Sequence, residues 1–156
     1  MTSDDIDKLK KLGAEKLADA LVYLASEHEA VANYVQTLIA DRKDLSNIFK
    51  ARLKSIKGSK RFIHYRETFN LSKELDSLLL EITDSVKDTR NCLDLIAAFI
   101  ETDNSIYGRC DDSSGCIADC YRNACRVFAD YAVRLNDEKY TEKLFCKLVS
   151  KNDYGT

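Results

Sequence analysis

Turn-forming residues are scarce in this sequence of 156 residues, which contains no proline and only five glycines. An all-β protein needs many tight turns between short strands, and proline and glycine form most of those turns. The scarcity of both therefore disfavours an all-β fold. Charged residues make up 32% of the chain, and this composition suits helices. We predict an all-α protein.

The sequence also lacks the segments that would direct it into a membrane or out of the cell. No apolar run approaches the roughly 18 residues that a membrane span requires. The start, MTSDDIDKLKK, has no apolar core of the kind that a secretion signal contains. The six cysteines are expected to be reduced, because the cytosol keeps thiols in that state. These features predict a cytoplasmic protein with no membrane partner.

Positive charge is concentrated in one part of the chain. The formal net charge is -2, but the segment from Arg42 to Arg66 carries nine lysines and arginines against one aspartate. Such a segment can bind phosphate groups or an acidic protein surface, with Phe62, Tyr65 or Phe69 available for stacking. The alternative is a solvated helix face whose charges pair with acidic helices of the same protein.

Apolar residues at helical spacing define one helix most clearly, over residues 71–86. They recur at three- and four-residue steps: Leu71, Leu75, Leu78, Leu79, Ile82 and Val86. Charged residues occupy the opposite face. The next helix, which Asp88 or Thr89 is expected to start, has a broader apolar face over residues 92–100. This indicates neighbours on several sides, so we expect the helix to be central.

The same pattern predicts further helices on either side of these two. They cover residues 3–12, 17–24 with 31–39 as a helical hairpin, a helix capped by Asp44 or Ser46 that stops at Gly58, 116–135 and 137–150. The total is seven or eight helices joined by short connections, so successive helices should be antiparallel neighbours. We predict a single all-helical domain over residues 1–156. It is built either as a short α–α superhelix of the armadillo, HEAT or TPR kind or as a compact helical bundle.

The basic segment and the cluster from Arg61 to Glu67 form the candidate interaction surface. Its seven members are Arg52, Lys57, Lys60, Arg61, His64, Tyr65 and Arg66. Arginine and tyrosine are common in binding hot spots, which favours a recognition role. The alternative is a structural role, in which Phe62 and Tyr65 pack the loop onto the following helix. An ion pair of Arg66 or Glu67 would then fix the start of that helix.

The cysteine spacing points away from a metal site. Four cysteines lie close together in the sequence: Cys110, Cys116, Cys120 and Cys125. Only Cys116 and Cys120 have the short separation that structural zinc sites use, and they would need Cys110 or a distant histidine to complete a site. Free cysteines are often buried as small apolar residues, which is the interpretation we favour. We therefore expect no bound metal and no cofactor.

Residues for nucleophilic catalysis are also scarce. His28 and His64 are the only histidines, and neither lies in a motif that pairs it with a nucleophilic cysteine or serine. The acidic segment 111–115 lacks the alternating oxygen ligands of a calcium loop. We expect Ser113 or Ser114 to cap the next helix there and the aspartates to favour its positive end. We predict no catalytic residue and no enzymatic activity.

Three motifs suggest a family. They are Phe62-x-x-Tyr65-Arg66-Glu67 with the leucine-rich helix after it, the turn Asp112-Ser113-Ser114-Gly115, and the closing Asp153-Tyr154-Gly155. In these motifs the chain resembles, over about residues 58–155, an uncharacterised bacterial family of all-helical domains of unknown function. Similar segments occur behind SWIM-type zinc fingers. The resemblance implies a helical, repeat-like fold and carries no catalytic residue over to this sequence.

These observations support one leading hypothesis about function. The protein is expected to be an interaction or scaffold module that binds another protein through the basic segment and residues 61–67. Binding of nucleic acid or another polyanion through residues 42–66 is the alternative. An enzyme of unknown type comes third.

Overall fold

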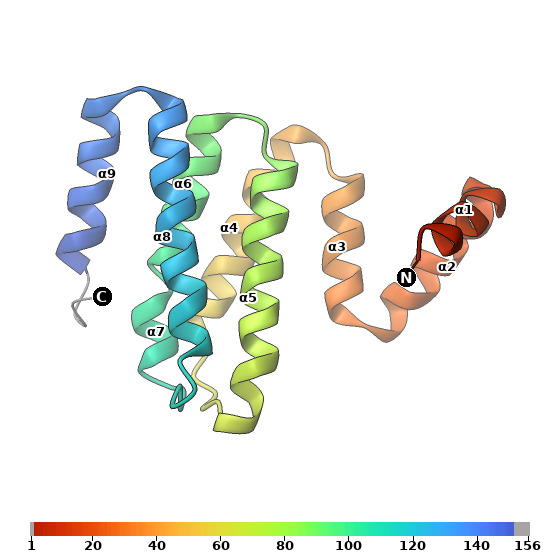
Figure 1. Cartoon of the computed structure of the whole chain (residues 1–156), viewed down its shortest axis with the longest axis horizontal. Helices are drawn as coiled ribbons and strands as arrows, with labels where there is room; N and C mark the ends of the chain where they lie inside the picture. Colours follow the sequence, from red (N-terminus) through yellow and green to blue (C-terminus); the bar gives the residue numbers. More distant parts are fainter. Residues whose placement is uncertain (1, 152–156) are drawn as a thin grey trace. The chain divides into compact units, whose positions relative to one another are not determined.

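The computed structural model describes residues 2–151, without the side chains of Arg42 and Lys43 (Figure 1). The helices are α1 (Ser3–Lys11), α2 (Ala14–Glu27), α3 (Glu29–Ile39), α4 (Arg42–Gly58), α5 (Tyr65–Ser85), α6 (Thr89–Ile100), α7 (Asp103–Tyr107), α8 (Cys116–Leu135) and α9 (Glu138–Lys151). Between residues 2 and 151, β-type pairing is limited to one isolated bridge, between Ile63 and Cys110. In the same range, no helix has both the length and the apolar character of a membrane span. The predicted all-α class is confirmed.

Two helices differ from the pattern-based prediction. α5 starts at Tyr65 rather than at Leu71, so the cluster from Arg61 to Glu67 includes its first turn. The first turn is largely exposed and therefore carries no apolar repeat. The short helix α7 was not predicted, because five residues make less than two turns and give no periodic pattern.

Aspartate side chains fix the starts of α6 and α8. Asp88 caps α6 by accepting a hydrogen bond from the Asn91 backbone N–H at 2.8 Å, as predicted. At α8 the prediction of a serine cap is wrong. The Asp112 carboxylate accepts from the backbone N–H groups of Ile117 (3.0 Å) and Ala118 (2.9 Å). A carboxylate suits this position because its negative charge faces the positive end of the helix dipole.

Contacts between helices divide the chain into two compact units, Met1–Asp41 and Arg42–Thr156. The first unit holds α1, α2 and α3, and α2 packs against α3 as the predicted hairpin. A capping box between Thr2 and Asp5 starts α1. The single domain over residues 1–156 stays a prediction, and the two units are described separately.

The helices of the second unit lie in two layers. One layer contains α4, α6 and α9, in which α6 contacts the other two. The other layer contains α5 and α8, which also contact each other. In Figure 1, α5 and α8 lie in front of α4 and α6. The layers are joined by α6, because this helix contacts both α5 and α8.

The core of the second unit surrounds α6. Its buried side chains are Cys92, Leu93, Leu95, Ile96, Ala97 and Phe99. Such burial follows from contacts with α4, α5, α8 and α9, and it confirms the predicted central position. The predicted apolar face of α5 supplies Leu75, Leu78, Leu79 and Ile82, whereas Leu80 on another face is 61% exposed.

Candidate functional site

The seven residues of the predicted interaction surface lie in two different settings. Two of them, Arg52 and Lys57, are on α4 and take part in contacts between helices. Arg52 is part-buried and pairs with Glu81 of α5, with Nη1 2.6 Å from Oε2 and Nη2 3.4 Å from Oε1. Nζ of Lys57 lies 3.7 Å from Oε2 of Glu101. Arg52 and Lys57 therefore follow the alternative prediction for the basic segment, in which its charges pair with acidic residues of the same protein.

The other five residues lie in or next to the first turn of α5: Lys60, Arg61, His64, Tyr65 and Arg66. A backbone bridge holds this segment in place. The Ile63 N–H donates to the Arg109 carbonyl at 2.8 Å, and the Asp111 N–H donates to the Ile63 carbonyl at 3.1 Å. The Arg109 guanidinium also donates to the Arg61 carbonyl at 3.0 Å. The loop after α7 therefore positions the backbone before α5.

Glu67 fixes the start of α5, as predicted for the structural role. Its carboxylate accepts a hydrogen bond from the His64 backbone N–H at 3.2 Å and forms an ion pair with Arg61. Arg66, the other candidate for this ion pair, is exposed and has no ion pair with a residue that the structure describes. Arg66 is therefore available to a partner, whereas the charge of Arg61 is compensated within the chain.

Three aromatic side chains at the start of α5 face solvent. Phe62, Tyr65 and Phe69 are 52%, 53% and 59% exposed. The predicted packing of Phe62 and Tyr65 onto the helix is therefore wrong. The extended segment before α5 buries Ile63, and because side chains alternate in direction along such a segment, Phe62 turns outward.

Lysine and arginine side chains accompany these aromatic residues. Tyr65, Phe69 and Lys73 follow one another at four-residue steps on one side of α5. The Lys73 ammonium lies 4.3 Å from the centre of the Phe69 ring, within the range of a cation–π interaction. We call the following exposed residues the α5 aromatic surface: Lys60, Phe62, Tyr65, Arg66, Phe69 and Lys73. Lys73 was not predicted to belong to it, although its spacing from Phe69 is visible in the sequence.

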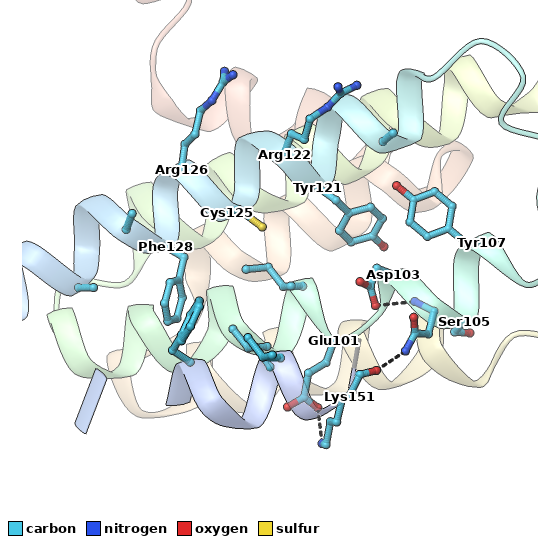
Figure 2. A pocket seen from close by; sticks show the side chains of 18 of the residues that line it. Glu101, Asp103, Ser105, Tyr107, Tyr121, Arg122, Cys125, Arg126, Phe128 and Lys151 are labelled. Carbon is cyan, nitrogen blue, oxygen red and sulfur yellow. Dashed lines mark hydrogen bonds and ion pairs between the residues drawn. The ribbon is translucent and has the colours of Figure 1, made fainter. Parts of the chain in front are cut away.

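A groove of about 990 Å³ lies between α8 and α9 (Figure 2). The larger apolar side chains that line it come mainly from these two helices: Tyr121, Phe128, Phe145, Leu148 and Val149. Phe145 and Val149 are 56% and 57% exposed, and no residue of α9 is buried. The groove is therefore open to solvent along α9. None of its residues except Lys57 was predicted to belong to a binding site.

One end of the groove is polar and centres on Glu101, just after α6. Its carboxylate lies 2.7 Å from Nζ of Lys147 and 3.0 Å from Nζ of Lys151, both on α9; Figure 2 includes the Lys151 pair. With Lys57, three lysines surround this carboxylate. Burial raises the Glu101 pKa, but the hydrogen bonds and charges of Lys147 and Lys151 outweigh burial, so the pKa lies below its usual value of 4.5.

Two other titratable groups in the groove, the Tyr107 hydroxyl and the Cys125 thiol, keep their protons near neutral pH. Burial, together with the charges of Asp112 and Asp103, raises the pKa of Tyr107 to about 12. Burial also raises the pKa of the Cys125 thiol. A protonated thiol is a poor nucleophile, so the groove is chemically better suited to binding than to covalent catalysis.

A family model described as a family of unknown function, DUF6880, matches residues 3–156. The chain belongs to this family. The match includes α1, α2 and α3, whereas the resemblance noted in the sequence covered only about residues 58–155. No curated protein and no solved structure matches the chain. The α5 aromatic surface and the groove both lie within the DUF6880 match.

The six cysteines of this DUF6880 protein are free thiols. Cys92 and Cys120 are buried, and Cys116 is half-buried. Burial and a hydrogen bond with Asp76 raise the pKa of Cys120 to about 12, so this thiol is protonated in the folded protein. Among residues 2–151, no three histidine, cysteine, aspartate or glutamate side chains are grouped in a way that could hold a metal ion.

Acid is expected to weaken the Glu101 cluster of the DUF6880 fold. Because the folded pKa of Glu101 is depressed, its ion pairs contribute full stability above about pH 4.5 and lose it as pH falls through the folded pKa. We expect Glu101→Gln to cost about 1–2 kcal/mol at pH 7 and almost nothing well below the folded pKa. Urea unfolding of the wild type and of Glu101→Gln at a series of pH values measures the difference in free energy of unfolding at each pH.

The exposed Glu142→Gln variant is the matched control for this pH series, since Glu142 lies on α9 with its side chain in solvent. It should follow the wild type at every pH. The difference in free energy of unfolding between Glu101→Gln and the wild type could also stay constant over the pH series. That result would show that the lysines do not stabilise the folded state through this carboxylate.

Proposed function

We propose that this DUF6880 protein is a non-enzymatic, cytoplasmic module that binds another protein through the α5 aromatic surface. The observation that carries the proposal is the exposure of Phe62, Tyr65 and Phe69, each more than half accessible to solvent. Tryptophan, tyrosine and arginine are enriched in protein-binding hot spots, and aromatic rings offer a large contact area with little loss of side-chain freedom. A partner that covers these rings would remove apolar surface from water.

The backbone beneath the α5 aromatic surface favours recognition for a second reason. The Ile63 bridge to the loop after α7 and the contacts of Glu67 hold the first turn of α5 in one position. A surface that is ordered before binding loses less conformational entropy when the partner arrives. Lys60 and Arg66 lie beside the aromatic rings in the sequence, so the favoured partner presents apolar residues surrounded by acidic ones.

Three further observations support the other parts of the proposal. The free state of all six cysteines agrees with a reducing compartment. The raised pKa values of Cys110, Cys120 and Cys125 disfavour thiolate catalysis, which supports a non-enzymatic role. The two layers of helices in the second unit support a scaffold of the helical-repeat kind.

Removing two of the exposed rings is expected to abolish capture of the partner. In a pull-down from a soluble extract of the native host, Phe62→Ala/Phe69→Ala should retain less than about a tenth of the partner that wild type retains, a loss of about 1.4 kcal/mol or more. Quantitative mass spectrometry compares the recovered proteins. The control is Leu80→Ala, which removes an equally exposed apolar side chain from a different part of α5.

Both variants should melt at the wild-type temperature, because the replaced side chains are exposed. Equal recovery of the same proteins by wild type and by Phe62→Ala/Phe69→Ala would contradict a role for the α5 aromatic surface. Recovery lost equally in Leu80→Ala would contradict it as well, since the effect would then not be specific to this surface.

Nucleic acid or another polyanion is the second candidate partner. Arg66 and Lys60 are exposed and have no ion pair with a described residue, and the neighbouring aromatic rings can stack on bases. Binding of this kind must weaken steeply as salt is added, because phosphate contacts release counterions. A gel shift with mixed single-stranded and double-stranded oligonucleotides at low and high salt decides the question. No shift at low salt would exclude this candidate.

A further inference from the structure

The groove between α8 and α9 lies where one layer of the second unit extends one helix beyond the other. The layer of α4, α6 and α9 has one more helix than the layer of α5 and α8. α8 faces α5 through Cys120, whose thiol donates to the Ser72 carbonyl at 3.4 Å. Ala129 is nine residues from Cys120, which corresponds to about 180° around the helix. The groove-lining side of α8 therefore faces the place that a third helix of the shorter layer would occupy.

We propose that this groove binds an acidic, amphipathic α-helix of a partner protein. The residues that line the groove include none of the α5 aromatic surface, and the inference does not depend on the function proposed for that surface. It rests on three properties of the groove: its position in the layers, its apolar and open lining, and the charge on its edge.

The lining has the shape and chemistry that a helix requires. On the α8 side, the small residues Ala118, Cys125, Ala129 and Ala132 recur at three-, four- and seven-residue steps and leave room for the backbone of an incoming helix. On the α9 side, Phe145 and Val149 stand more than half exposed at four-residue spacing. Apolar residues of a helix at positions i, i+3, i+4 and i+7 can pack between these two sides.

The open side of the groove argues for a polypeptide rather than a small apolar molecule. Small-molecule sites bury most of the ligand surface inside a cavity. Here Phe145 and Val149 remain accessible, and a ligand that touched them would keep one face in water. An amphipathic helix meets that condition because its polar face stays solvated while its apolar face is buried.

Positive charge on the edge of the groove selects an acidic helix. Arg122 and Arg126 project from the outer edge of α8, as Figure 2 shows. Arg126 has no ion pair with any residue among those described, and Arg122 pairs only with the exposed Asp119 at 2.6 Å. Glu101, at the other end, is already compensated by three lysines. Four cations line the groove, Lys57, Arg122, Arg126 and Lys151, against the two carboxylates Glu101 and Asp103, so the formal charge that the lining presents to a ligand is positive.

A designed peptide tests the proposal directly. The probe is a fluorescein-labelled helix of about 15 residues, the length of α8 from Ala118 to Ala132, with leucines on one face and glutamates on the others. One control peptide has lysine in place of every glutamate, and another has the same composition in scrambled order. In fluorescence anisotropy with the full chain, the acidic peptide should bind at least about tenfold more tightly than either control.

Two variants locate the site, and a third separates it from the α5 aromatic surface. Phe145→Glu should weaken binding of the acidic peptide by about tenfold or more, because it places a carboxylate in the apolar lining. Arg126→Glu should narrow or reverse the preference between the acidic and the lysine peptides. Phe69→Ala should leave binding unchanged. All three positions are exposed, so circular dichroism and melting temperature should match those of the wild type.

Three results would overturn the proposal. The first is equal affinity for the acidic, lysine and scrambled peptides. The second is undiminished peptide binding by Phe145→Glu. The third is concentration-dependent dimerisation of the wild type in sedimentation velocity that Phe145→Glu abolishes, because the groove would then be occupied by a second copy of this chain. Failure of the peptide experiment would leave the effect of Phe62→Ala/Phe69→Ala on partner capture unaffected.

Discussion

Phe99→Ala is expected to lower the free energy of unfolding by about 3–5 kcal/mol, the largest effect of any substitution considered for this protein. Phe99 is 0% exposed in the last turn of α6, and its ring centre lies 5.5 Å from that of Tyr121 on α8. Removing the ring deletes buried apolar contacts, including the one with Tyr121, and leaves a cavity that a close-packed core cannot fill. Urea unfolding followed by far-UV circular dichroism measures the loss.

The exposed residue Leu80 provides the matched control, because Leu80→Ala also removes an apolar side chain from a helix but should change stability by less than about 0.5 kcal/mol. A loss of 5 kcal/mol is a large part of the stability of an ordinary domain, so Phe99→Ala can unfold altogether. Phe99→Leu, with an expected loss of about 1–2 kcal/mol, keeps the measurement possible. Unchanged stability in both variants would contradict the central position of α6.

Arg52→Ala is expected to cost about 2–3 kcal/mol, which is unusual for a residue of a basic, mostly exposed helix. The Arg52 and Glu81 side chains are only 21% and 14% exposed, and two of their atom pairs lie within hydrogen-bond distance. Removing the guanidinium leaves the Glu81 carboxylate partly buried without its partner, and that costs more than the pair itself contributes. The Arg52 guanidinium also lies 5.8 Å from the Phe49 ring centre, so packing is lost as well.

A double substitution that removes both charges separates these contributions. Arg52→Met/Glu81→Leu removes both charges and keeps the side-chain volume, so it should recover most of the stability that Arg52→Ala loses. The control Lys54→Ala removes an exposed cation from the same helix and should be nearly neutral. If Arg52→Ala were as mild as Lys54→Ala, Arg52 would be free for binding, as the sequence-based surface assumed.

The sequence predicted most of the helices because their signal is local. In α5 the apolar positions from Leu71 to Ile82 repeat along a stretch that is itself one helix, and burial follows the same repeat. The broad apolar face of α6 likewise indicated a central helix. The start of α5 was missed because residues 65–70 do not carry this repeat, and α7 was missed because it is too short for one.

The candidate site was predicted less well, because its properties depend on residues far apart in the sequence. The basic segment is a feature of composition, but Glu81 and Glu101 decide that Arg52 and Lys57 are engaged within the fold. Phe62 and Ile63 are both large apolar residues, so the sequence does not show which of them is buried. Ile63 is the buried one because its backbone bridges to the loop after α7. The bridging residues are more than 40 positions away, so no local sequence pattern predicts this bridge.

By itself, the sequence determined that this protein is all-α, which helix is central and where positive charge is concentrated. Those properties come from helical periodicity and composition, which a short stretch of chain contains in full. Only the tertiary structure decided which cations and aromatic rings reach solvent and that α8 and α9 leave an open groove between them. The physical reason is that exposure depends on which helix faces are covered, and contacts between helices join residues far apart in the chain, 29 positions for Arg52 with Glu81 and 50 for Glu101 with Lys151.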